Sequence, residues 1–133
     1  MSGMHFVVEL KESRAEIARF VAVGELSPDE ILEAHRTFLD SAPRVLALVD
    51  LSSATLARID GESMRQLARR AAQLGNHRHA RGRVAIVCAR DVDFGMARMF
   101  STYASLYCHP VRFEVFPGPD SARAWLAGEF ECP

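Results

Sequence analysis

The chain has 133 residues, of which 49% are hydrophobic and 25% are charged, and its formal net charge at pH 7 is -1. This length and composition are typical of one globular domain, and they exclude both intrinsic disorder and a strongly basic nucleic-acid binder. No segment approaches the ~18 uninterrupted apolar residues of a membrane span, and the first residues lack the pattern of a secretory signal. We therefore expect a single cytoplasmic domain over residues 1–133.

Residues that carry chemistry are sparse. Cys88, Cys108 and Cys132 are widely spaced and form no C-x-x-C motif, so neither a disulfide framework nor a zinc site is indicated. Lys11 is the only lysine, which excludes the P-loop, Schiff-base and receiver-domain chemistries that need a lysine at a defined position. No serine nucleophile elbow and no glycine-rich dinucleotide loop occurs. We expect no enzymatic activity and no cofactor.

Two strand patterns open the chain, at residues 5–10 and 16–23, and the polar residues between them predict a hairpin. Ser27 and Glu30 then form a capping box, with Pro28 at the first helical position. Apolar residues at helical spacing continue this helix for about three turns.

The apolar run at residues 45–49 is typical of a strand buried on both faces, and Asp50 follows at its expected C-terminal end. There Asp50 either orients a ligand or caps the next loop. Asp91 or Asp93 is expected to cap the third helix. The remaining expected elements are a helix over 64–74, a strand over 84–89, a helix over 94–107, a strand over 111–116 and a helix over 119–126.

The order β-β-α-β-α-β-α-β-α predicts an α/β fold. Each late strand is followed by a helix long enough to cross over and return parallel to the sheet, and such crossovers are right-handed. We therefore expect a mixed, mainly parallel sheet of about five strands with about four helices.

Five segments match the pattern of a known family. They are residues 24–30, 45–51, 83–87, 111–116 and 122–126. In them the chain resembles the STAS superfamily of sulfate transporters and anti-sigma-factor antagonists, especially its SpoIIAA-like (sporulation anti-sigma-factor antagonist-like) branch of small bacterial proteins. The resemblance implies one STAS-like regulatory domain that acts through protein-protein contacts. This branch is also similar to lipid-carrying domains of the Sec14 type, which implies a small apolar ligand as the alternative.

In the antagonists that this chain resembles, an Asp-Ser-Ser-Gly-like motif opens the second helix and carries a phosphorylated serine. The matching stretch here begins at Asp60 and reads Asp-Gly-Glu-Ser. The resemblance places the phosphoacceptor position at Glu62, or at Ser63 if the alignment shifts by one residue.

Basic charge is concentrated in one segment. Residues 63–90 contain seven arginines and no acidic residue. Such a segment attracts an acidic protein partner or a phosphate, or it is a solvated helix face and loop neutralised by the rest of the fold. No aromatic residues interleave with it, so nucleic acid is not expected. The arginines expected in a partner-binding patch are Arg65, Arg69, Arg70, Arg78 and Arg81.

The third helix is unusually apolar, since Arg98 is its only charged residue between Phe94 and Tyr107. A helix that is apolar on most sides must bury a second face against another helix, another subunit or a ligand. We expect a homodimer interface, a lipophilic pocket or further core packing there. The residues expected to line the interface or pocket are Met96, Met99, Phe100 and Tyr103.

The histidines do not predict a metal site. His77 and His79 alternate with arginines, which oppose a cation, and His109 next to Cys108 is expected in a solvated loop. His35 lies in the apolar stripe of the first helix, where we expect it to be partly buried and bonded to backbone.

Overall fold

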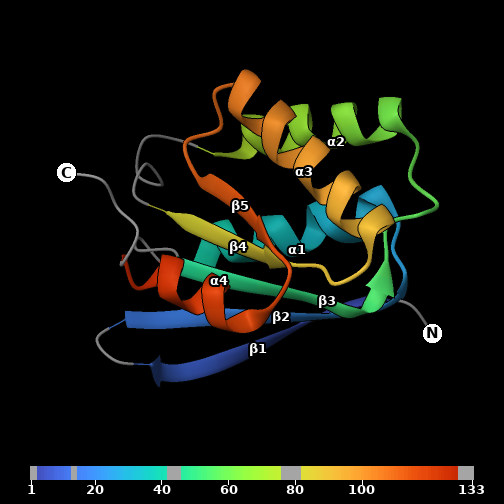
Figure 1. Ribbon diagram of the computed structural model, residues 1–133. Helices are drawn as coiled ribbons and strands as arrows, with labels where there is room; N and C mark the ends of the chain where they lie inside the picture. Colours follow the sequence, from blue (N-terminus) through green and yellow to red (C-terminus); the bar gives the residue numbers. More distant parts are fainter. Residues whose placement is uncertain (1–2, 13–14, 42–45, 76–81, 129–133) are drawn as a thin grey trace.

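The computed structural model describes residues 3–12, 15–41, 46–75 and 82–128, which form one sheet covered by helices (Figure 1). The elements follow the expected order, which confirms the α/β prediction. They are β1 (Gly3–Glu12), β2 (Ala15–Glu25), α1 (Pro28–Ser41), β3 (Leu46–Thr55), α2 (Gly61–Leu74), β4 (Arg83–Val87), α3 (Asp91–Leu106), β5 (Arg112–Phe116) and α4 (Pro119–Leu126).

The five strands lie in the sheet in the order in which they occur in the chain, from β1 to β5. β1 pairs with β2 in antiparallel orientation, and the other neighbours are parallel. The sheet is therefore mixed and mainly parallel, as predicted. Because each parallel strand is reached through a helix, the loops that follow these strands gather at one edge of the sheet.

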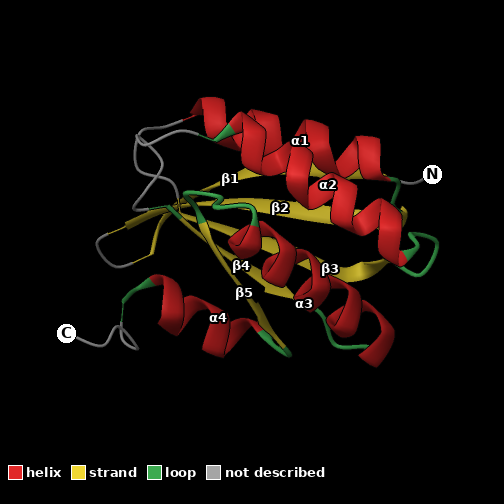
Figure 2. Ribbon diagram, turned by 90° about the horizontal axis from the view of Figure 1, so that it is seen from above, coloured by secondary structure: helices red, strands yellow, loops and turns green. Residues whose placement is uncertain are grey.

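The helices form two unequal layers. α1, α2 and α3 bury one face of the sheet, and α4 alone packs on the other (Figure 2). In the smaller layer Trp125 packs against Leu48 and Ala85, and the guanidinium of Arg83 lies 5.6 Å from the centre of the Trp125 ring. The larger core therefore lies between the sheet and the first three helices.

Local capping positions α1 as expected. The Ser27 hydroxyl accepts a hydrogen bond from the amide of Glu30 at 3.2 Å, and the Glu30 carboxylate accepts one from the amide of Ser27 at 3.0 Å. This is a complete capping box, so that prediction is confirmed.

The third strand is longer than predicted, and this changes the place of Asp50. β3 continues to Thr55 because its polar second half still pairs with the end of β2. Asp50 therefore lies in the middle of the strand, next to Val21 and Val87, and not at its C-terminal end. Its carboxylate accepts hydrogen bonds from the amide and hydroxyl of Ser52 and lies 3.4 Å from the guanidinium of Arg19. Of the two expected roles, the local bond to backbone is the one observed.

The prediction that Asp91 or Asp93 caps α3 is wrong. Arg90 occupies the N-cap without a side-chain cap bond, and both aspartates lie in the first turn. The Asp93 side chain points inward, because its carboxylate accepts bonds from the Leu56 amide at 2.7 Å and the Thr55 hydroxyl at 2.8 Å. Asp93 is 2% exposed and also pairs with Arg90. It therefore joins the start of α3 to the end of β3.

Two histidines meet in the core. The Nε2 atoms of His35 and His109 lie 2.8 Å apart, and both residues are buried. The expectation of a solvated loop is thus wrong for His109, which packs edge-on to Phe113. The Val111 amide donates to Nδ1 of His109, so this neutral ring carries its proton on Nε2 and donates it to His35. His35 is buried, more fully than the predicted partial burial, and its described bond is to a side chain. His77 and His79 lie outside the described residues.

Asp93→Ala should destabilise the fold by about 1–3 kcal/mol, because the buried Leu56 amide loses its acceptor. The free energy of unfolding in urea is the measurement. Asp91→Ala is the control, since Asp91 is exposed in the same helical turn and contributes at most about 1 kcal/mol through the helix dipole. Equal losses in the two variants would contradict the role given to Asp93.

Asp50 should make stability depend on pH. Partial burial opposes ionisation of Asp50, but hydrogen bonds from Ser52 and Arg19 outweigh it and lower the pKa of the carboxyl. Asp50 therefore stabilises the fold above the ordinary aspartate pKa of about 3.9, and this stabilisation is lost as the pH falls through the lowered value. Wild type should exceed Asp50→Asn in unfolding free energy at pH 7 by up to about 1 kcal/mol, and the difference should vanish in acid. A difference that is independent of pH would contradict the prediction.

Candidate functional site

The candidate site is the surface formed by α2 and the neighbouring flank of α3. α2 begins at the sheet edge that follows the parallel strands, where open α/β sheets bind their ligands. Its N-cap is Asp60, whose carboxylate accepts a bond from the Ser63 amide at 2.7 Å. Hydrogen bonds from the backbone and side chain of Ser63 lower the pKa of Asp60. Gly61 lies close to Met99, so the start of α2 contacts the middle of α3.

Glu62, the first candidate phosphoacceptor position, is an exposed carboxylate that already has partners. Arg65 donates to it from Nε at 3.0 Å, and Gln66 donates at 3.1 Å. These bonds, that of Arg65 first, lower the pKa of Glu62. The position therefore carries a fixed negative charge, and its carboxylate offers no hydroxyl for phosphate transfer.

Ser63, the second candidate position, is half-buried in the first turn of α2. A phosphate on its hydroxyl would gain from the positive end of the helix. It would also lie near the Asp60 carboxylate, which accepts a bond from the Ser63 amide, and like charges repel.

The predicted arginine patch is only partly brought together. Arg69 and Arg70 are exposed on α2, and neither has an ion-pair partner among the described residues. Arg65 is instead held by Glu62 and by the hydroxyl of Tyr107, to which it donates at 2.6 Å. The bond to Glu62 and then that to Tyr107 raise the pKa of Arg65. Arg78 and Arg81 lie outside the described residues.

The apolar residues of α3 find much of their cover within the chain. α3 packs on the sheet and also lies beside α2 (Figure 2). Phe100 is buried, whereas Met96, Met99 and Tyr103 are half-buried and pack at the edge of the core. Of the apolar residues that α3 exposes, Leu106 retains 69% of its surface.

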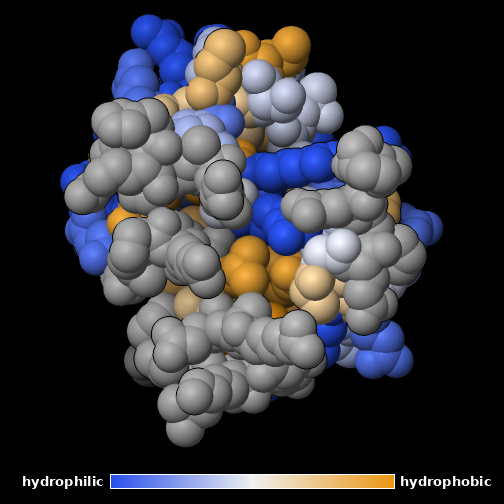
Figure 3. Space-filling view, turned by 90° about the vertical axis from the view of Figure 1, so that its left-hand side faces the viewer, coloured by the Kyte–Doolittle hydropathy of each residue, from blue (hydrophilic) through white to orange (hydrophobic). Residues whose placement is uncertain are grey.

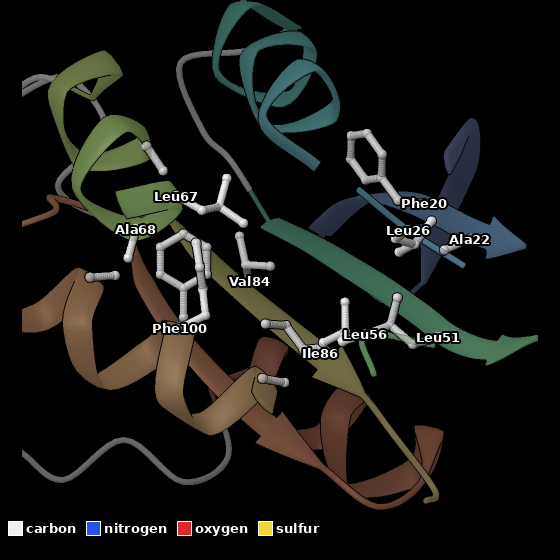
Figure 4. Close-up of a cluster of buried hydrophobic side chains, with 14 of the residues drawn as sticks. Phe20, Ala22, Leu26, Leu51, Leu56, Leu67, Ala68, Val84, Ile86 and Phe100 are labelled. Atoms are coloured by element: carbon white, nitrogen blue, oxygen red, sulfur yellow. The ribbon is translucent and has the colours of Figure 1, made fainter. Parts of the chain in front are cut away.

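A small apolar cavity of about 80 Å³ lies between the sheet and the first three helices. Figure 4 shows Phe100 and Leu67 reaching toward Val84 and Ile86 of the sheet from two different helices. Of the four predicted pocket residues only Phe100 lines the cavity. On the face from which β3 and β4 start, hydrophobic residues are visible next to a band of hydrophilic ones (Figure 3).

The sequence pointed to Arg65 but not to Tyr107 as its partner, because 42 positions separate the two residues. Tyr107 follows the last turn of α3, and its ring stacks on Tyr103 at 6.5 Å between centroids. The only available signal was a tyrosine next to a predicted apolar helix, and this pattern does not identify a partner.

Other chemistry is not assembled in the described part of the chain. No group of three metal-ligating side chains occurs there. Cys88 is buried, and burial first, then the charge of Asp93, raises the pKa of its thiol to about 12. Among the described helices, none has both the length and the apolar character needed to cross a membrane.

Comparison with known proteins identifies the fold. No protein-family model and no curated protein matches the chain. Among solved structures, an uncharacterised protein of the DUF3478 family with a SpoIIAA-like fold, from Shewanella loihica PV-4, is similar with a TM-score of 0.53. The two chains are 19% identical, and the match covers 95% of each. Together with the order of the strands and helices, this similarity shows that the chain has a SpoIIAA-like α/β fold.

Proposed function

We propose that the chain is a STAS-like, non-enzymatic regulatory module that binds an acidic protein partner through the exposed face of α2. The supporting observation is that Arg69 and Arg70 are exposed and have no ion-pair partner in the described part of the chain. Unpaired guanidinium groups favour carboxylates, which they bind with two parallel hydrogen bonds.

The charge along α2 supports an acidic partner. Glu62 is the only acidic residue of this helix, and its carboxylate is bonded to Arg65. The helix therefore presents a net positive surface, which accelerates encounter with a negative protein and excludes a positive one.

The polar contacts at the start of α2 also support a role in binding and not in catalysis. The polar groups at the start of α2 hold one another, since Asp60 caps the helix and Glu62 holds Arg65. In this proposal Glu62 supplies a permanent charge where the antagonists that the chain resembles add phosphate. The contact with the partner is then constitutive unless Ser63 is modified.

Arg69→Glu/Arg70→Glu should abolish capture of the acidic partner by the immobilised protein. The melting temperature should hardly change, because exposed charges contribute less than about 1 kcal/mol each to stability. Binding of the wild type should also weaken as salt rises.

The matched control is Arg36→Glu/Arg112→Glu, which changes the net charge equally at exposed residues on α1 and β5. A captured protein counts as the partner only if it is acidic, stays with the control and is lost by the α2 variant. If the α2 variant retains every protein that the wild type captures, the proposal is wrong.

The alternative function is binding of a small apolar ligand, and the cavity supports it. Its lining is apolar apart from His35. Apolar cavities of roughly 150 Å³ stay dry and bind benzene or xenon. At about 80 Å³ this cavity accommodates a smaller guest and not a lipid acyl chain.

Xenon should raise the thermal midpoint of the wild type, because a ligand that binds only the native state stabilises it. Ala34→Leu places a larger side chain at the cavity wall and should remove the shift. Gln73→Leu, which adds an apolar side chain at an exposed position of α2, should retain it. Equal shifts in all three proteins would contradict binding in this cavity.

A further inference from the structure

Gly95 lowers the stability of α3 at its position in the helix. It is exposed in the interior of the helix, where glycine is less favourable than alanine by about 0.5–1 kcal/mol. A Cβ atom added at Gly95 would meet nothing within 4 Å, and the backbone there has no positive φ. Nothing in the described part of the chain therefore requires glycine at this position. Close approach of another molecule would require it.

Two opposite charges flank Gly95 on the same face of the helix. Asp91 precedes it by four residues and Arg98 follows it by three, which is the spacing of a single stripe. Both side chains are exposed, and neither forms a hydrogen bond or ion pair within the described residues.

A second, apolar stripe lies beside the charged one on α3. Val92 is 60% exposed, and Met99, seven residues later, is half-buried beside Gly61. Val92 is one of three large hydrophobic side chains exposed among the described residues whose exposure is known.

We propose that α3 binds a second copy of the chain, with the two α3 helices antiparallel about a two-fold axis at Gly95. Such an axis places residues whose numbers add to about 190 opposite each other. Asp91 then faces Arg98 of the partner subunit, and Val92 faces Met99 of the partner subunit. Gly95 meets Gly95 of the partner subunit, where the two backbones approach most closely.

The pattern fits a second copy because a two-fold axis keeps each flank on its own side. The charged stripe of one subunit therefore meets the charged stripe of the other, with opposite signs facing. The apolar stripes meet in the same way along the opposite edge. A different protein would need its own charged and apolar stripes at matching positions, whereas a second copy of the chain already carries both. This inference is independent of the acidic partner of α2.

Sedimentation equilibrium over a range of protein concentrations tests the proposal. The wild type should form a dimer, and Gly95→Leu should raise its dissociation constant by roughly tenfold or more, because a large side chain separates the helices. The same change should leave the melting temperature of the monomer unchanged or raise it, since leucine is a better helix former. Ser105→Leu, on the same helix but beyond the paired segment, is the control and should remain dimeric.

A charge exchange tests the register. Arg98→Asp and Asp91→Arg should each be monomeric alone, because like charges then face each other. An equimolar mixture of the two variants should form a heterodimer, in which both contacts again join opposite charges, one with the wild-type sign and the other reversed. A wild type that stays monomeric at the highest concentration, a Gly95→Leu variant with an unchanged dissociation constant or a mixture that stays monomeric would each overturn the proposal.

Discussion

The buried carboxylate of Asp93 is the interaction on which the arrangement of the helices depends. It accepts bonds from the Leu56 amide and the Thr55 hydroxyl while pairing with Arg90. One side chain therefore holds the start of α3 against the end of β3. Because α2 begins five residues after Leu56, the same bond also sets where α2 begins relative to α3. The candidate partner surface lies on an element placed in this way, and the apolar cavity lies between such elements.

Local patterns predicted the order of the elements and the capping of α1. The bonds of the Ser27–Glu30 capping box span three residues, so the sequence contains all the information they need. The end of β3 could not be predicted in this way. Its last residues are small and polar, and they extend the strand only because β2 lies beside them. Long-range pairing overrode the local composition there.

The candidate site shows the same division. The positive charge of the arginine segment is evident from the sequence, but the sequence does not show which of its arginines are free to bind a partner. Arg65 is held by a tyrosine 42 residues away, whereas Arg69 and Arg70 remain exposed. Likewise the apolar character of α3 is a local property, whereas the share of it that α2 covers depends on the packing of the two helices. Sequence patterns indicate which residues can bind, and tertiary contacts determine which of them are left to do so.

The pairing of His35 with His109 has a consequence for biosynthesis. The strands lie in the sheet in chain order, so each can add to the growing edge as it leaves the ribosome. α1 cannot complete its packing at the same pace, because His109, whose ring bonds His35 of α1, is synthesised 74 residues later. Until then His35, on the apolar side of α1, lacks the rings of His109 and Phe113 that lie against it in the finished fold. During translation there is thus an interval in which the first strands and α1 have been synthesised but part of the apolar surface of α1 is still exposed to solvent.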